Sequence, residues 1–228
     1  MLPSLLAVGQ NTTVRSNDTT SSFTPEANAL LFVAASVLTT VSASVPDLTD
    51  TAGLSWATLQ NQTFNGSTNR FLLWQATAPA SPTAMTVSWS YGTAMGSRAW
   101  IVSQHTGYNT GAPLVSGSTA AAGATSSTPS TSVPALANAA NVQVLWVTSR
   151  NATITAEAGW STSTVTLPPA TTNSLGLFYL TSPGDTSPSA TLGGSSPWRL
   201  YAGEINVEDA GAVVGISTAL RISRRRRR

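Results

Sequence analysis

The stretch ALLFVAASVLTTVSASV, from Ala29 to Val45, decides the fold class of this chain. From Thr39 onward apolar and polar side chains alternate, which is the period of a half-buried strand. Residues 29–38 are apolar with one break at Ser36, a run too short for a membrane-spanning helix of roughly 20 residues. We therefore expect Leu30 to Val45 to form one long strand that begins in the core and ends at a solvated edge, and we expect no membrane span.

The composition indicates a folded chain with few charges. The chain has 228 residues, and all-β units of roughly 200–250 residues commonly form one domain. Charged residues make up 9% of the chain, against about 25% in an average protein. Cysteine is absent, which excludes a disulfide scaffold, a thiolate metal site and a cysteine nucleophile. The opening MLPSLLAV lacks a basic start and a long apolar run, so we expect no standard secretion signal.

Apolar strand patterns recur at short intervals along the chain, and no amphipathic helical pattern separates them. Such spacing favours antiparallel sheets over βαβ units. We predict an all-β fold, an antiparallel two-sheet β-sandwich with about ten strands. Besides the first stretch, the predicted strands are 12–15, 54–59, 70–77, 85–91, 99–106, 142–148, 153–158, 163–167, 175–181, 198–207 and 212–222, the last being either a strand or a short helix.

The predicted organisation has three parts: an N-terminal arm at 1–26, a β-sandwich domain at 27–210 and a C-terminal segment at 211–228. Residues 116–132 are small and show no periodicity. They form either a long surface loop within the domain or a linker that divides the chain, and we favour the loop.

Few residues form a recognisable catalytic pattern. His105 is the only histidine, so any Ser-His-Asp arrangement would need it as the base. A histidine that makes an ordinary hydrogen bond at a strand end is the simpler interpretation. Glu204, Glu208 and Asp209 lie close together, and carboxylate pairs cleave glycosides. A solvated strand edge explains these three acids equally well.

Metal-binding patterns are equally sparse. Asp47 and Asp50, in the turn-rich segment before Gly53, offer oxygen atoms for Ca²⁺, but the spacing of an EF-hand loop is missing. A plain Asx-turn is the simpler interpretation. We therefore predict no catalytic residue, no metal site and no cofactor.

The seven tryptophans have two interpretations. They form a stacking platform for sugars, or they are core anchors within the apolar strands, and we favour the second. Trp160 lies between Gly159 and Ser161 and is the one we expect to be exposed. The tryptophans are Trp56, Trp74, Trp89, Trp100, Trp146, Trp160 and Trp198.

The C-terminal end carries the strongest charge feature. Residues 1–220 hold five arginines and nine acidic residues, whereas the last eight residues hold six arginines. A dense arginine segment binds phosphates or acidic protein surfaces through bidentate contacts. The alternative is a disordered, solubilising end. We predict that the partner-binding residues are Arg221, Arg224, Arg225, Arg226, Arg227 and Arg228.

Four short patterns carry a resemblance to a known group of proteins. They are ANALLFVA at Ala27–Ala34, DTAGLSW at Asp50–Trp56, RFLLWQA at Arg70–Ala76 and WRLYAGEI at Trp198–Ile205, with HTGYNTGAPLV at His105–Val115 between them. The sequence resembles β-sandwich, jelly-roll-like virion proteins of tailed bacteriophages, which serve as head decoration, fibre or tail components. The resemblance spans residues 27–208 and rests on core and turn patterns.

The resemblance implies a non-enzymatic virion structural protein, expected to be a head decoration or minor capsid protein. Its expected partners are the major capsid protein or other virion proteins, with further copies of itself as a homo-oligomer. Its expected location is the virion, assembled in the host cytoplasm. Three alternatives stay open: a carbohydrate-binding or adhesin module, a capsid protein whose arginine tail contacts the genome, and an enzyme that uses His105.

Overall fold

The computed structural model describes residues 3–38, 47–121, 126–161, 173–181 and 183–207. These residues form strands, isolated bridges and turns, and every strand pair is antiparallel. The predicted all-β, antiparallel class is therefore confirmed. The described part of the chain contains no helix of the length and apolarity that a membrane crossing requires.

The described residues hold fourteen strands, more than the ten or so expected. The first half of the chain supplies β1 (Ser4–Asn11), β2 (Arg15–Thr19), β3 (Leu30–Leu38), β4 (Asp47–Asp50), β5 (Ala57–Phe64), β6 (Asn69–Thr77), β7 (Val87–Met95) and β8 (Arg98–His105). The second half supplies β9 (Leu114–Ala121), β10 (Val142–Ser149), β11 (Ile154–Ala156), β12 (Ser174–Leu180), β13 (Ala190–Leu192) and β14 (Trp198–Ile205). The strands predicted at 163–167 and 212–222 lie outside the described residues.

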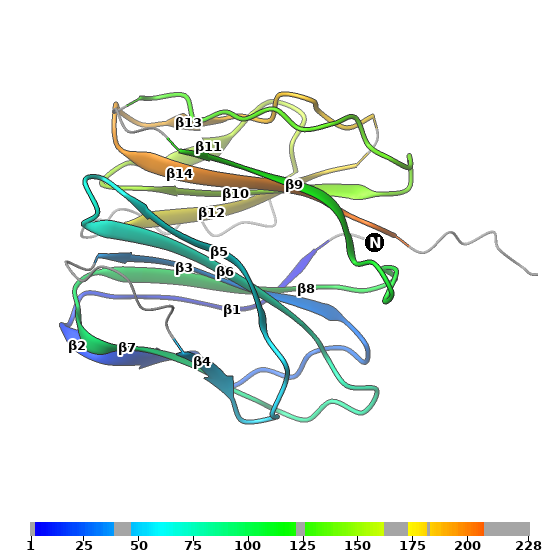
Figure 1. Ribbon diagram of the computed structural model, residues 1–228, viewed down its shortest axis with the longest axis horizontal. Helices are drawn as coiled ribbons and strands as arrows, with labels where there is room; N and C mark the ends of the chain where they lie inside the picture. The colour runs from blue at the N-terminus through cyan, green and yellow to red at the C-terminus, as the bar shows by residue number, and fades with distance from the viewer. Residues whose placement is uncertain (1–2, 39–46, 122–125, 162–172, 182, 208–228) are drawn as a thin grey trace, which may run out of the picture.

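Each half of the chain builds two sheets. The first half forms a five-stranded sheet in the order β1-β8-β3-β6-β5 and a three-stranded sheet in the order β2-β7-β4. The second half forms a four-stranded sheet, β12-β10-β14-β9, and a two-stranded sheet, β11-β13. The four sheets lie in layers, with the five-stranded and four-stranded sheets in the middle and the two smaller sheets outside them (Figure 1).

Strand β3 lies in the middle of the five-stranded sheet, paired with β6 on one side and β8 on the other. Leu30, Phe32 and Ala34 pack into the core toward the four-stranded sheet. The alternate residues, Val33 and Ala35 among them, pack toward the three-stranded sheet. A strand buried on both faces needs a continuous apolar run, which explains why residues 30–38 do not alternate. The predicted strand is confirmed for 30–38, and its second part, 39–45, lies outside the described residues.

Three apolar cores separate the four layers. The central core joins the five-stranded and four-stranded sheets and contains Trp146. The second core joins the five-stranded and three-stranded sheets and contains Trp74, Trp89 and Trp100. The third core joins the four-stranded and two-stranded sheets and contains Trp198. Large aromatic side chains thus anchor each layer to the next, as we predicted for most of the tryptophans.

Trp160 is a correction, because it is not exposed. Its side chain packs into the third core with only 7% of its surface accessible. The indole N–H donates a hydrogen bond to the Asp185 carboxylate at 3.3 Å. The neighbouring Gly159 has a φ of 93°, a conformation that glycine adopts readily, so the local sequence marks a tight turn and not a surface position.

Two segments expected to lie outside the sheets belong to them. Residues 1–26, predicted to be an arm, contribute β1, which pairs with β8, and β2, which pairs with β7. Residues 116–121 of the predicted loop at 116–132 lie in β9, which pairs with β14. β2 and β9 carry mainly polar or small residues, whereas β1 includes Leu5, Leu6 and Val8. All three are edge strands, which backbone hydrogen bonds hold to their neighbours.

Candidate interaction surface

The arginines of the folded body gather at one end of the layers. Arg70 in β6 and Arg98 in β8 both lie opposite Val37, near the end of β3. Arg15 begins β2 and lies opposite Met95, three residues before Arg98. Strand ends that pair with each other lie at the same end of their sheets. These three arginines therefore lie close to one end of the layers.

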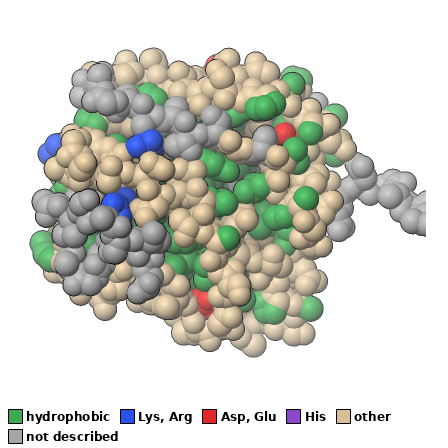
Figure 2. Space-filling view, viewed as in Figure 1, with side chains coloured by type: hydrophobic (Ala, Val, Ile, Leu, Met, Phe, Trp, Pro, Cys, Tyr) green, Lys and Arg blue, Asp and Glu red, His purple; other side chains and the backbone are tan. Residues whose placement is uncertain are grey.

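The second half of the chain adds two arginines to the same end. Arg199 lies opposite Thr148, and the Thr148 hydroxyl hydrogen-bonds to the Ser36 Oγ at 2.5 Å, across the central core. Arg150 directly follows the last residue of β10. We call this region the arginine end: Arg15, Arg70, Arg98, Arg150 and Arg199. Figure 2 shows the arginine side chains of one face gathered at its left, with the visible carboxylates further right.

Arg98 forms an internal ion pair. Its Nε donates to the Asp18 carboxylate at 2.6 Å, with 0% and 4% of the two side chains accessible. The remaining guanidinium nitrogens donate to the carbonyl oxygens of Met95, Gly96 and Thr13, at 3.1, 2.6 and 3.1 Å. Because every guanidinium nitrogen donates a hydrogen bond, this pair holds the three-stranded sheet onto the five-stranded sheet. It is the one ion pair found among the described side chains.

Arg150 and Arg199 are less completely bonded. One terminal nitrogen of Arg199 donates to the Thr63 carbonyl at 2.6 Å, which bridges the two central sheets. The Nε atoms of Arg150 and Arg199 are buried without a hydrogen-bond partner. Burial lowers the pKa of Arg199, but a guanidinium stays charged at neutral pH. The arginine end therefore holds positive charge and N–H donors that the described residues do not satisfy.

Apart from Asp18, the described carboxylates lie toward the opposite half of the molecule. Glu204 lies opposite Gln143, and the Gln143 side chain donates to the Asp185 carbonyl oxygen. The Glu26 backbone N–H donates to Gln104, next to the end of β8 that lies farthest from Arg98. We call this region the carboxylate half: Glu26, Asp50, Glu157, Asp185 and Glu204.

Glu204 does not lie at a solvated edge, contrary to one of the two interpretations of the acidic cluster. The residue is 3% exposed. Its carboxylate accepts hydrogen bonds from the Ala137 N–H at 2.7 Å and from the Asn141 side-chain amide at 2.6 Å. Strand β14 lies between β10 and β9, which explains the burial. The other two members of the cluster, Glu208 and Asp209, lie outside the described residues.

Asp50 forms the Asx-turn that the sequence indicates. Its carboxylate accepts hydrogen bonds from the Ala52 N–H at 2.7 Å, the Leu54 N–H at 3.0 Å and the Trp56 indole N–H at 2.8 Å. Protein donors thus already bond the two Asp50 oxygens that were considered for Ca²⁺. The side chain of Asp47, the other residue considered, is not described. Within the described ranges, no group of three histidine or acidic residues has the geometry to hold a metal ion.

His105 does not make the ordinary hydrogen bond that we expected. The ring is 2% exposed, and both of its nitrogens lack a hydrogen-bond partner. It packs edge-on against Phe32, with ring centroids 5.4 Å apart. Burial lowers the pKa of His105 to about 3. The side chain is therefore neutral at physiological pH and enclosed between the two central layers.

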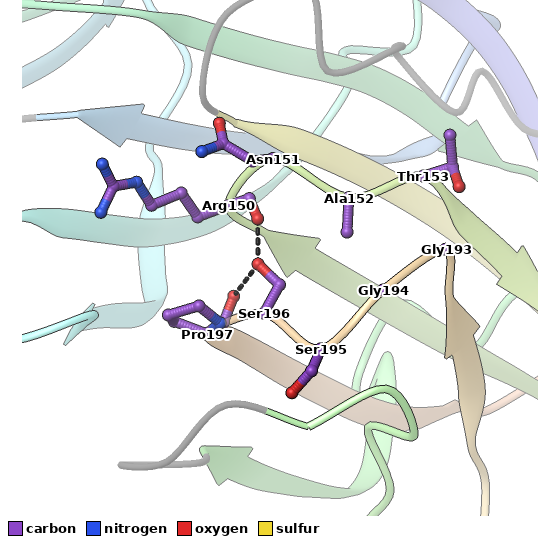
Figure 3. A pocket seen from close by; sticks show the side chains of 9 residues that line it. All are labelled: Arg150, Asn151, Ala152, Thr153, Gly193, Gly194, Ser195, Ser196 and Pro197. Atoms are coloured by element: carbon purple, nitrogen blue, oxygen red, sulfur yellow. Dashed lines mark hydrogen bonds between the residues drawn. The ribbon is translucent and has the colours of Figure 1, made fainter.

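An open hollow of about 510 Å³ lies at the arginine end. It is formed by the β10–β11 and β13–β14 connections, with Arg150, Asn151 and Ser196 among its lining residues. The Ser196 hydroxyl donates to the carbonyl oxygens of Arg150 and Pro197, and the Arg150 side chain extends away from the glycine-rich side (Figure 3). The hollow is lined mainly by backbone and small side chains, which do not converge as an acid–base or nucleophilic set.

The predicted partner-binding residues, Arg221 and Arg224 to Arg228, lie outside the described residues. Sequence reasoning missed the arginine end, although one signal was present. Four of the five body arginines lie within one residue of the end of a predicted strand, and Arg150 lies two residues after one. Comparisons with protein-family models, with curated proteins and with solved structures found no match for the chain.

Proposed function

We propose that this chain is a non-enzymatic structural protein of a bacteriophage virion, a head decoration or minor capsid protein that binds the capsid lattice. One observation supports the proposal best: polar side chains bond to other parts of the same chain, and large aromatic side chains fill the cores between the layers. Arg98, Asp18, Glu204 and Asp50 form internal bonds that hold strands and layers together. A folded body held together by such internal bonds suits a static structural component of a particle, which makes broad contacts with its neighbours.

The low surface charge supports the same role. The exposed residues of the edge strands β1 and β5 carry no charged side chain. Uncharged polar surfaces and backbone edges make wide contacts in assemblies. In the proposal, the two central layers form the β-sandwich that the resemblance implies. The chain completes the five-stranded sheet before it enters the four-stranded one, so we do not retain a jelly-roll order of strands.

The arginine tail is the proposed attachment segment. Arg221 and Arg224 to Arg228 provide six guanidinium groups, which bind carboxylates or phosphates in pairs of hydrogen bonds. The proposed partner is an acidic surface of the major capsid protein or of another virion protein. The location is the virion, assembled in the host cytoplasm.

No observation favours the carbohydrate-binding alternative. A sugar platform needs exposed tryptophan or tyrosine rings. Among the described side chains, six tryptophans and three tyrosines are buried, and Trp56 is half-buried.

The test is binding of the full-length chain to purified particles of the virus that encodes it. We compare the wild type with a chain in which Arg224–Arg228 are replaced by serine, over about 50 to 500 mM salt. A second chain, with the same arginines replaced by lysine, keeps the charge and serves as the matched control.

We expect the wild type to bind in a salt-sensitive way, the lysine chain to retain part of the binding, and the serine chain to lose it. Equal binding by all three chains would contradict the role of the tail. A wild type that does not bind the particles at any salt concentration would contradict the proposed function.

A further inference from the structure

We propose that Arg150 and Arg199 together form a binding site for a phosphate dianion at the arginine end of the two central sheets. This inference goes beyond the proposed function, since it concerns the folded body and holds whether or not the body belongs to a virion.

The two arginines lie on neighbouring strands of the four-stranded sheet. Arg199 in β14 lies opposite Thr148 in β10, and Arg150 comes two residues after Thr148. The Arg150 backbone N–H donates to the Pro197 carbonyl at 3.1 Å, which continues the pairing of the two strands. Residues offset by two on paired strands lie roughly 7–8 Å apart, within reach of long side chains. The two guanidinium groups can therefore contact the same ligand.

Both side chains project toward the five-stranded sheet. The Thr148 hydroxyl bonds Ser36 of β3, and the Arg199 guanidinium donates to the Thr63 carbonyl of β5, so both cross the central gap. Alternate residues of a strand point to the same face, which places Arg150 on the face of Thr148. In agreement, the Arg150 side chain extends away from the glycine-rich side of the hollow (Figure 3).

The two guanidinium groups keep N–H donors without an acceptor. Both side chains are half-buried, and the Nε atom of each is buried without a hydrogen-bond partner. Their one side-chain bond to the described residues runs from Arg199 to Thr63. Burial also lowers the pKa of Arg199, because it disfavours the charged form. Buried donors without a partner are rare in folded proteins and costly, so an anion that accepts from both groups stabilises the pair.

The described carboxylates do not neutralise this pair. Glu204, the acidic residue of β14, lies five residues from Arg199, roughly 17 Å along the strand. Asp18 is bonded to Arg98, on the face of the five-stranded sheet that packs toward the three-stranded sheet.

The surroundings of Arg150 supply no carboxylate either. The residues that line the hollow beside it include no aspartate or glutamate. The segments between the described ranges, 39–46, 122–125, 162–172 and 182, contain no acidic residue in the sequence. A ligand from outside the folded body is therefore the expected source of the negative charge.

Phosphate fits two arginines better than a carboxylate does. An arginine presents parallel N–H donors that match two oxygens of a carboxylate or phosphate group. One such fork occupies both oxygens of a carboxylate, whereas a phosphate dianion has oxygens for a second arginine and two charges to balance two guanidinium groups. The ligand class is therefore phosphate, either free or as a terminal monoester.

The test is isothermal titration calorimetry with inorganic phosphate at constant ionic strength. The reference is the full-length chain with Arg224–Arg228 replaced by serine, because the tail itself binds phosphate. Two variants of this reference, Arg150→Gln and Arg199→Gln, each remove one guanidinium of the site. The matched control is Arg15→Gln, which removes an exposed arginine of the outer three-stranded sheet.

We expect the reference to bind one phosphate per chain. Each glutamine variant of the site is expected to raise the Kd at least tenfold, because charge-assisted bonds are lost, whereas Arg15→Gln changes the Kd by less than about twofold. A glycerol phosphate titration is expected to match the inorganic phosphate titration if the site takes monoesters, and to show no binding if it takes free phosphate only.

A thermal melt separates loss of the site from loss of the fold. Phosphate at about 10 mM is expected to raise the melting temperature of the reference and of Arg15→Gln, because the ligand binds the folded state. Arg150→Gln removes no side-chain hydrogen bond to the described residues, so its melting temperature without phosphate is expected to equal that of the reference. With phosphate it is expected to gain nothing.

Three results would overturn the inference: no saturable phosphate binding by the reference, binding that survives both Arg150→Gln and Arg199→Gln, or an equal loss in Arg15→Gln. A fourth is acetate binding as strong as phosphate binding, which would make the site a carboxylate site. Particle binding through the tail is measured separately, so failure here leaves the proposed function standing.

Discussion

The buried His105 makes the stability of the fold depend on pH in a range where little else titrates. The ring lies between the two central sheets with neither nitrogen hydrogen-bonded. Its pKa is about 3 in the folded chain, against about 6.5 in an unfolded one. The unfolded chain therefore binds the proton more tightly, so the folded state loses stability as the pH falls below 6.5.

The size of the effect follows from the two pKa values. Each pKa unit corresponds to about 1.36 kcal/mol, so the loss between pH 6.5 and pH 3 reaches about 5 kcal/mol. Between pH 7 and pH 5 the expected loss is about 2 kcal/mol. Because the chain has one histidine and no cysteine, and carboxylates titrate mainly near pH 4, this interval isolates His105.

The assay is denaturant-induced unfolding at pH 7, 6 and 5 for the wild type and for His105→Leu. Leucine removes both unpartnered nitrogens and keeps an apolar side chain in the core, so we expect its free energy of unfolding to vary by less than about 0.5 kcal/mol over this interval. A wild type with equally flat stability would refute the reasoning. So would a leucine variant that loses as much stability as the wild type.

Three further predictions concern the packing of the layers. Asp18→Ala leaves the Arg98 guanidinium buried without its carboxylate, so we expect the free energy of unfolding, measured by chemical denaturation, to fall by about 3–5 kcal/mol. The double variant Asp18→Leu with Arg98→Met removes both charges. A smaller loss in this double variant would support the cause, and an equal loss would contradict it. Gly9→Ala places a methyl group 2.1 Å from the Trp100 ring, so we expect a loss of about 1–3 kcal/mol, whereas Gly194→Ala, with nothing within 4 Å, serves as the neutral control. Asp50→Ala removes the acceptor of three N–H groups, and we expect about 1–3 kcal/mol of destabilisation with a shift in tryptophan fluorescence from Trp56; an unchanged melting temperature and spectrum would show that the turn forms without it.

The apolar strands were the predictable part of the fold. β3, β6, β8, β10, β12 and β14 are buried and rich in branched or aromatic residues, and each lies close to a segment predicted from its pattern. β1 and β9 were missed, and β2 was predicted too early, at 12–15. β2 and β9 carry mainly polar or small residues, and all three strands are held in place by backbone pairing with strands far away in the sequence. Such pairing leaves no local periodicity.

The candidate site was harder to predict than the fold. Arg15, Arg98 and Arg199 are separated by many residues in the chain, and only the strand registers bring them to one end. Asp18 lies 80 positions from Arg98, in a segment predicted to be an arm. Glu204 belongs to an acidic cluster in the sequence, yet its place on an inner strand buries it. In the sequence the densest positive charge lies in the tail. The tail was therefore predicted to bind a partner, and the folded body was not.

The measurement that tests the proposed function most directly is a reconstruction of the particle from the virus that encodes this chain, combined with mass spectrometry of its proteins. We predict that the chain is present in many copies and that its four-layered body appears on the head, in contact with the capsid lattice. Purified particles that lack the chain, or heads without density for such a body, would contradict the account.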